Sequence, residues 1–186
     1  MRLKRNFYTQ NALKIAPNLL GKILVRKYPS GKIVKYIITE TEAYCGEKDK
    51  ASHAFKGKTP RTKVMYEEGG LIYTYLVYGM YWMLAIEVNS KNNPEVVFIR
   101  CLDGFSGPGK VGKELKIDKS FYGEDLTKSK RIWIEDNLQR QNFTIKKAKR
   151  VGVNYAEEYA EKLWRFILVV KPKIWVKTGK KGLKTV

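Results

Sequence analysis

The amino-acid sequence predicts an α+β fold in a single mixed domain built around antiparallel strands. Strand-like apolar runs follow one another without the regular strand–helix–strand alternation of parallel sheets. Two of these runs flank the turn sequence at 29–32, which is typical of a β-hairpin. The chain of 186 residues contains 44% hydrophobic and 12% aromatic residues, with no internal repeat or linker. This length and composition are sufficient for one buried core.

The first predicted element is a short helix. Thr9 can cap its N-terminus, and apolar side chains on one broad face continue to about Leu20. Pro17 predicts a break or a kink before that end, because proline lacks the backbone N–H that a helix interior uses.

The predicted hairpin consists of strands at 22–28 and 32–44. Successive side chains of a strand point to opposite faces of its sheet. If the second strand is regular, its even positions Glu40, Glu42 and Tyr44 therefore share one face. The hairpin brings two acids and an aromatic ring to one side of the sheet, at the end of a strand.

The rest of the chain is predicted to contain further strands, loops and two short helices. Aromatic and β-branched residues favour strands, and Gly79 interrupts the longest such run. Predicted strands cover 71–88, 95–102, 130–136 and 166–176, while helical segments lie within 107–117 and 154–166. The basic sequence from about 177 to 186 is typical of a mobile tail.

The charge balance indicates a polyanionic partner. The formal net charge is +19, from 37 Lys and Arg against 18 Asp and Glu. Such an excess repels itself in a compact chain, and nucleic acid relieves that repulsion. A highly charged surface of the thermophile type is the alternative, but it explains abundant charge rather than a two-to-one excess of basic residues.

Two cysteines and one histidine limit the metal chemistry. Cys45 and Cys101 form no CxxC pair, and with His53 alone they cannot form the usual Cys/His zinc site. We expect both to be small buried or half-buried side chains.

The N-terminus lacks the apolar segment of a signal peptide, and no apolar run is long enough to span a bilayer. These observations predict an intracellular protein, in the cytoplasm or with the DNA of the nucleoid or nucleus, that does not enter a membrane.

Glu42 and His53 are the candidates for chemistry in the first half of the chain. Glu42 can act as a general base if it stays ionised beside a positive group, for which Arg100 is a candidate. The alternative is a surface carboxylate that offsets nearby lysines. His53 can hydrogen-bond a ligand or a phosphate, or it can be a satisfied structural histidine.

Aromatic residues concentrate between Tyr73 and Trp82. Tyr73 and Tyr75 share a strand face, and Tyr78 precedes Gly79, where a turn can project its ring outward. Cross-strand aromatic pairs of a half-buried strand explain this block structurally. A surface that stacks on bases, or a wedge that enters a duplex, is the functional alternative.

Long segments of the chain carry a specific resemblance. The most specific are ETEAYCGEKDKASHAFKGKTPR (40–61) and MYEEGGLIYTYLVYGMYW (65–82). The others are APNLLGKILVR (16–26), VVFIRCLDG (96–104), GPGKVGKEL (107–115), GEDL (123–126) and KRVGVNYAEEYAEKLWRF (149–166). In this order, and over most of the chain, they resemble the alkyladenine (3-methyladenine) DNA glycosylase family.

The resemblance implies a monofunctional DNA-repair glycosylase that needs no metal or organic cofactor. It implies that Glu42 is the general base that activates the attacking water, that Arg100 helps to hold this water, and that the carbonyl of Val151 is its third contact. The implied substrate is double-stranded DNA with a damaged purine of the alkylated adenine, hypoxanthine or ethenoadenine type. Hydrolysis of the N-glycosidic bond leaves an abasic site. The implied fold is a single domain (1–186) with a curved antiparallel sheet surrounded by short helices, acting as a monomer.

The resemblance also implies a pocket for a base that leaves the duplex. Tyr44 and Tyr75 match residues that stack on the flipped base, and His53 matches a residue at its edge. Tyr78 matches the residue that enters the duplex and fills the gap. Unstacking a base costs a few kcal/mol, so a wedge and a stacking pocket offset that cost.

The chain departs from the family pattern at two places. Family members generally carry asparagine where this chain has Ala85, and that asparagine helps to exclude the exocyclic amine of guanine. Ala85 therefore predicts a roomier pocket that discriminates less against guanine-type bases. The segment before Gly107 is shorter than in many members, so DNA contacts made there are missing or replaced.

Three other functions stay open at the sequence level. The first is a catalytically silent DNA-binding protein, against which Glu42 argues. The second is a bifunctional glycosylase with lyase activity, which needs a lysine amine as nucleophile, and no lysine stands out. The third is an RNA-binding protein, which basic and aromatic residues serve equally well.

Overall fold

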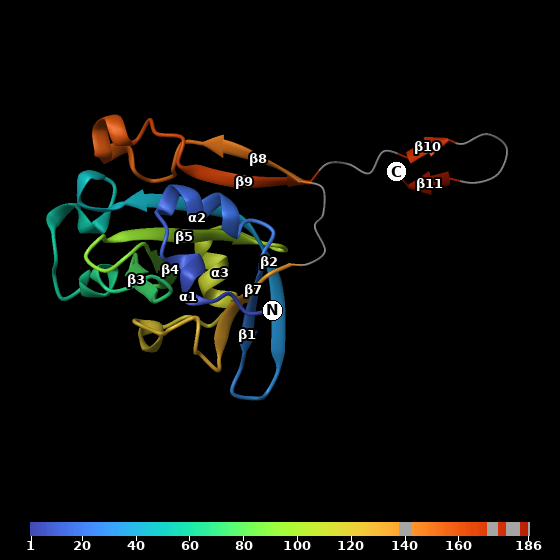
Figure 1. Cartoon of the computed structure of the whole chain (residues 1–186), viewed down its shortest axis with the longest axis horizontal. Helices are drawn as coiled ribbons and strands as arrows, with labels where there is room; N and C mark the ends of the chain where they lie inside the picture. The colour runs from blue at the N-terminus through green and yellow to red at the C-terminus, as the bar shows by residue number, and fades with distance from the viewer. Residues whose placement is uncertain (138–142, 171–174, 178–182, 186) are drawn as a thin grey trace.

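The fold is an open antiparallel sheet with short helices packed against it (Figure 1). The computed structural model describes residues 1–137, 143–170, 175–177 and 183–185. Within them, the nine strands of the main sheet are β1 (Ile23–Lys27), β2 (Ile33–Cys45), β3 (Ile72–Val77), β4 (Tyr81–Val88), β5 (Glu95–Leu102), β6 (Phe105–Ser106), β7 (Ile132–Glu135), β8 (Phe143–Ala148) and β9 (Arg165–Val170). The order is β3-β4-β5-β2-β1-β7, with β6 paired to β5, β9 to β2 and β8 to β9.

Short helices complete the domain. The α-helices are α1 (Arg5–Tyr8), α2 (Ala12–Leu19) and α3 (Pro108–Glu114), and the 3₁₀ helices are η1 (Gly46–Lys48), η2 (His53–Lys56), η3 (Lys63–Tyr66), η4 (Lys119–Phe121) and η5 (Asn154–Tyr159). Helix α2 packs on β2 and β5, and α3 packs on β4, β5 and β6. Their buried side chains, such as Ile15, Leu19 and Val111, join those of the strands in the largest apolar cluster. This architecture confirms the predicted α+β class.

Helix α2 begins at a different cap from the predicted one. The side chain of Asn11, rather than that of Thr9, accepts a hydrogen bond of 2.9 Å from the backbone N–H of Lys14. Pro17 lies inside α2 without ending it, so the predicted break is wrong. The N–H that proline lacks would bond to the carbonyl of Leu13, and Leu13 is exposed, so water can satisfy that carbonyl.

The predicted hairpin of β1 and β2 is confirmed, and it determines where Glu42 lies. The two strands pair along the whole of β1. Farther along β2, β9 takes the place of β1 as neighbour, while β5 lies on the other side. A register irregularity at Glu40 accompanies this change. Glu42 consequently lies inside the sheet, opposite Phe98 of β5 and Arg165 of β9.

The aromatic block forms β3, β4 and the tight turn between them. Val77 pairs with Tyr81, so the turn consists of Tyr78, Gly79 and Met80. Tyr78 has a φ of 51°, in the left-handed region that few non-glycine residues adopt. Its side chain is 88% exposed. The outward projection predicted for Tyr78 is thus confirmed.

Two segments differ from the sequence-based expectation. Residues 154–166 were expected to form one helix, but only the 3₁₀ helix η5 forms before β9 begins. Glu157 has a φ of 50°, which interrupts helical geometry there. Strand β8 has no counterpart among the predicted strands, because exposed lysines occupy much of it. The short segment before Gly107 forms a tight hairpin in which Cys101 pairs with Ser106.

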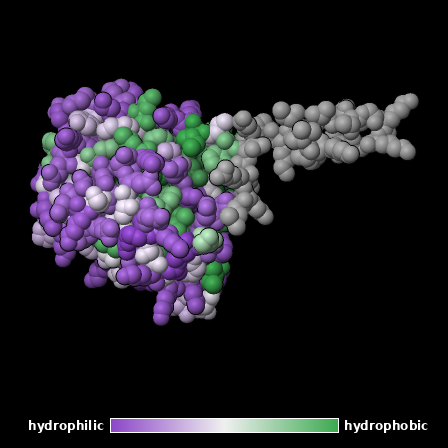
Figure 2. Space-filling model, viewed as in Figure 1, coloured by the Kyte–Doolittle hydropathy of each residue, from purple (hydrophilic) through white to green (hydrophobic). Residues whose placement is uncertain are grey.

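The predicted tail is described only in part. Residues 183–185 form β11 (Leu183–Thr185), which pairs with β10 (Trp175–Lys177) in a separate two-stranded sheet. Residues 178–182 and 186 lie outside the described residues, so the mobility of the tail stays a prediction. In the described ranges, no helix has the length and apolar character needed to cross a membrane. Hydrophilic residues cover most of the face that Figure 2 shows.

Candidate active site

Glu42 is a buried carboxylate held by three donors. Its side chain has no exposed surface. Oε1 accepts a hydrogen bond of 2.9 Å from the backbone N–H of Val151 and lies 3.3 Å from Nη1 of Arg100. Oε2 accepts a hydrogen bond of 2.9 Å from the hydroxyl of Tyr44. An ionised carboxylate offers about four acceptor positions, so one of them has no donor among the described residues.

Burial raises the pKa of Glu42 above its ordinary value. Arg100, the N–H of Val151 and the hydroxyl of Tyr44 act in the opposite direction, because they favour the ionised form. Burial and the neighbouring carboxylate also raise the pKa of Tyr44, so this phenol keeps its proton and remains a donor. A carboxylate with a raised pKa that still has donors for its charged form is suited to take a proton from water.

Arg100 is held in place by a second acid, Glu40. Nε of Arg100 donates to Oε1 of Glu40 at 2.9 Å, and Nη1 of Arg165 donates to the same oxygen at 3.1 Å. The side chains of Arg100 and Glu40 are 13% and 15% exposed. Cys101, a buried free thiol, donates to the other oxygen of Glu40 at 3.2 Å. Glu40 and Glu42 therefore act on Arg100 from the same side of the sheet, as their even spacing predicts.

A buried ion pair supports the segment that carries Val151. Nη1 and Nη2 of Arg150 donate to Oδ2 and Oδ1 of Asp49 at 2.5 and 2.8 Å, and both side chains are fully buried. Arg150 also donates to the backbone carbonyl of Ala43 at 3.0 Å. Its guanidinium lies 4.7 Å from the ring centre of Tyr44. This cluster therefore connects the loop of Val151 to the strand that carries Tyr44.

A hollow of about 360 Å³ opens beside Glu42. All predicted site residues except Glu42 line it, namely Tyr44, His53, Tyr75, Tyr78, Ala85, Arg100 and Val151. Glu42 lies behind this lining and bonds to three of its members. Apolar side chains, including Met65, Met83 and Phe98, form much of the remaining wall. The volume lies in the range of about 300–1,000 Å³ that is common for small-molecule pockets.

His53 presents a neutral imidazole to the hollow. Its ring meets the ring of Tyr75 edge to face, with centroids 4.7 Å apart. Nδ1 lies 2.8 Å from the hydroxyl of Tyr73, which leaves Nε2 as the second polar atom of the ring. Burial, together with the positive charge of Arg61, lowers the pKa of His53 to about 4. At neutral pH this imidazole therefore adds no charge to the pocket.

Ala85 contributes a small apolar side chain to the wall of the hollow. It is 1% exposed and lies on β4 between Tyr73 of β3 and Phe98 of β5. It offers a methyl group and no hydrogen-bonding atom. The only restriction on a base at this point is therefore steric.

Exposed apolar side chains project from the β3–β4 turn and from the first residue of β4, and Tyr78 among them also lines the hollow. Tyr78, Met80 and Tyr81 are 88%, 65% and 42% exposed. Helix α3 lies close to this turn, since a Cβ on Gly112 would come within 1.9 Å of the carbonyl oxygen of Trp82. The turn thus has a fixed base and a projecting apolar tip next to the hollow.

Sequence reasoning missed several residues that hold the site together. Glu40, Asp49 and Arg61 lie inside the motif at 40–61, but nothing in the sequence shows which groups they approach. Glu40 and Asp49 meet arginines, and Arg61 lies over the ring of Tyr75. Arg150 is missed for the same reason, because its partner Asp49 is 101 residues away. One signal in the sequence could have identified these residues: a charged residue in apolar surroundings needs a partner of opposite charge or a hydrogen-bonding group.

Comparisons with known proteins identify the family of the chain. The family described as Methylpurine-DNA glycosylase (MPG) matches residues 6–106 and 102–172. A relative from Natranaerobius thermophilus is 39% identical over 194 residues, covering 92% of this chain and 98% of its own length. Relatives from Clostridium novyi and Borreliella burgdorferi are each 40% identical, covering 90% and 89% of this chain and 94% and 95% of their own. All three are named "Putative 3-methyladenine DNA glycosylase".

These matches span most of the chain, in the region that contains the Glu42 site and its hollow. The chain therefore belongs to the methylpurine-DNA glycosylase family, enzymes of DNA base-excision repair that hydrolyse N-glycosyl bonds.

Proposed function

We propose that this protein flips a damaged purine out of duplex DNA and hydrolyses its N-glycosidic bond with a water molecule that Glu42 activates. The observation that carries the proposal is the environment of Glu42. A buried carboxylate with one acceptor position left lies beside a hollow large enough for a base. Arg100 lies 3.3 Å from that carboxylate and also lines the hollow, so it can contact the same water.

The proposed reaction is a hydrolysis without a covalent enzyme intermediate. Glu42 accepts a proton from water, and the water oxygen forms a bond to C1′ of the sugar. The bond between C1′ and the base nitrogen breaks, and its electron pair leaves with the base. A cationic 3-methyladenine leaves as a neutral molecule, whereas an uncharged purine such as hypoxanthine takes up one proton, which balances the proton that Glu42 accepts. The products are a free base and an abasic site. Since the lysines play no nucleophilic part, strand cleavage is not expected.

Base flipping is supported by the aromatic groups around the hollow. Tyr44 and Tyr75 can stack on an extruded base, and His53 can bond to its edge through Nε2. Tyr78 stands at the rim with 88% of its side chain exposed, and it can fill the space that the base leaves. The net charge of +19 supplies attraction for the phosphates.

The proposed substrates are alkylated adenine, hypoxanthine and ethenoadenine, with tolerance of N-alkylated guanine. The tolerance follows from Ala85, whose methyl group leaves room for an exocyclic amine. An Ala85→Asn variant should keep hypoxanthine excision and lose excision of N-alkylated guanine. Refusal of N-alkylated guanine by the wild type, unchanged in the variant, contradicts the role of Ala85.

The function is tested by single-turnover excision from duplexes that contain one hypoxanthine, ethenoadenine or 3-methyladenine. We expect release of free base, and strand breaks only after alkaline treatment of the abasic product. Breaks without that treatment indicate a lyase. Binding without base release indicates a silent DNA-binding protein, and stronger binding to structured RNA than to damaged duplex indicates an RNA partner.

A further inference from the structure

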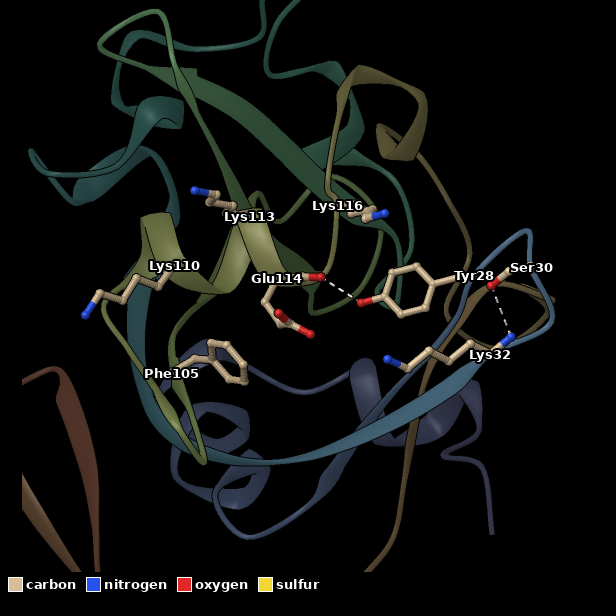
Figure 3. A pocket seen from close by; sticks show the side chains of 8 residues that line it. All are labelled: Tyr28, Ser30, Lys32, Phe105, Lys110, Lys113, Glu114 and Lys116. Carbon is tan, nitrogen blue, oxygen red and sulfur yellow. Dashed lines mark hydrogen bonds between the residues drawn. The ribbon is translucent and has the colours of Figure 1, made fainter.

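A second hollow, of about 530 Å³, lies between the β1–β2 turn and helix α3 (Figure 3). Four of its eight lining residues are lysines: Lys32, Lys110, Lys113 and Lys116. We name these four the lysine cradle. In Figure 3 they lie around Glu114, with Phe105 and Tyr28 at two sides of the group. The cradle shares no lining residue with the hollow beside Glu42.

The cradle carries positive charge without matching carboxylates. In the described part of the chain, none of the four lysines belongs to an ion pair. Lys35 of β2, three positions after Lys32, does pair, at 2.8 Å from Glu135. Glu114 is the single acid in the lining, and its Oε1 already accepts a hydrogen bond of 2.7 Å from the hydroxyl of Tyr36. The local excess of positive charge therefore needs an external anion.

The wall beneath the lysines is fixed in place. The hydroxyl of Tyr28 donates to the backbone carbonyl of Glu114 at 2.7 Å, which joins the β1–β2 turn to the end of α3. The guanidinium of the buried Arg26 lies 4.9 Å from the ring centre of Tyr28, and the ammonium of Lys116 lies 5.6 Å from it. Only the flexible lysine side chains must become ordered when an anion binds. Such side chains can follow phosphates whose positions along the cradle vary.

The cradle begins close to the base hollow. Phe105 lines the cradle and Pro108 lines the base hollow, and the two are three positions apart in the sequence. Even a fully extended chain spans only about 10 Å over three residues. A duplex strand advances about 3.4 Å along its axis for each nucleotide. A strand with one nucleotide in the base hollow therefore brings phosphates about three nucleotides away to the cradle.

We propose that the lysine cradle binds the phosphate backbone of the same DNA duplex, about three nucleotides to one side of the damaged one. The proposal rests on the function given above and adds a second, sequence-independent contact to it. The cradle anchors the duplex and takes no part in chemistry. The cradle increases the affinity for DNA, and this increase depends on how far the duplex extends on one side of the lesion.

The test compares two triple variants that each lose three charges. One carries Lys32→Gln, Lys113→Gln and Lys116→Gln, and the other carries Lys14→Gln, Lys91→Gln and Lys128→Gln. All six lysines are exposed, so both variants should fold. Fluorescence anisotropy with an undamaged duplex gives the binding constant at several salt concentrations. A hypoxanthine duplex gives the saturating single-turnover rate.

We expect the cradle variant to bind roughly tenfold or more weakly, with a salt slope smaller by about 2 to 3, since each lost phosphate contact removes about 0.9. The second variant should differ little from wild type. Binding to shortened duplexes is measured with one hypoxanthine present and with Glu42→Gln added to each protein, so that the lesion stays in place. Cutting this duplex to within three nucleotides of the lesion on one side should weaken binding by the protein with the intact cradle and leave the cradle variant unaffected. The saturating rate should be the same in all three proteins.

Equal salt slopes in the two variants overturn the cradle, because they show that only total charge matters. An equal loss of affinity when the duplex is shortened on either side of the lesion overturns the cradle as well. If the wild type releases no base, the proposed function fails while the anisotropy comparison still decides whether the cradle contacts DNA.

Discussion

Replacing Tyr44 by phenylalanine tests the electrostatics of Glu42 without removing the ring that we propose stacks on a base. The Tyr44 hydroxyl donates one of the bonds to the buried carboxylate, at 2.9 Å. A hydrogen bond to a charged group contributes about 1.5–3 kcal/mol. It stabilises only the ionised form of Glu42, and one pKa unit corresponds to about 1.4 kcal/mol. Its loss therefore raises the pKa of Glu42.

The expected consequence is a displaced pH–rate profile. Excision needs ionised Glu42, so the rate increases with pH as Glu42 loses its proton. In Tyr44→Phe this acidic limb should move to higher pH by about one to two units, because about 1.5–3 kcal/mol is lost. At pH values above the limb, most of the rate should return.

The assay is single-turnover excision of hypoxanthine between pH 5 and 9 with saturating enzyme. The matched control is Tyr75→Phe, which removes a hydroxyl that is not among the described donors to Glu42. Its limb should stay where it is in the wild type. A limb that does not move in Tyr44→Phe, or that moves equally in both variants, refutes the assignment of the titration to Glu42.

Three further predictions concern the groups around the site. Glu40→Gln should slow excision roughly 10- to 100-fold by releasing Arg100, with little change in DNA affinity; an unchanged rate contradicts this. Asp49→Asn should lower the free energy of unfolding by about 3–5 kcal/mol in urea titrations, because Arg150 keeps a buried charge without its partner; a loss below about 1 kcal/mol contradicts it. Burial raises the pKa of Glu87 to about 10, so the folded state keeps a proton that the unfolded chain loses above pH 4.5. Wild-type stability should therefore fall with increasing pH from about 4.5 to 10, at up to about 1.4 kcal/mol per pH unit from this group. Glu87→Gln should remove that slope, and parallel pH dependences of the two proteins refute it.

Local spacing predicts part of the active site. Glu42 and Tyr44 are two residues apart in a strand, so their side chains share a face, and the bond of 2.9 Å between them follows directly. The turn at Tyr78 is equally local, because Gly79 interrupts the aromatic run. Such features depend on a few neighbouring residues.

Partners that meet through sheet pairing cannot be predicted in this way. Arg100 at the end of an apolar run needs an acid, but its pairing with Glu40 depends on the register of β2 against β5 across 60 residues. The prediction of the N-cap of α2 is wrong for a related reason. Thr9 and Asn11 are both favoured N-cap residues, and the fold places Asn11 at the helix start.

The role of Glu42 as the base that activates water is tested most directly by Glu42→Gln. The amide keeps the size of the side chain and cannot accept a proton from water at neutral pH. Single-turnover excision from a hypoxanthine duplex, measured beside duplex binding, separates chemistry from recognition. We predict that Glu42→Gln binds the damaged duplex as the wild type does and releases no base on the time scale of wild-type turnover. Base release by the variant at the wild-type rate contradicts the proposed mechanism.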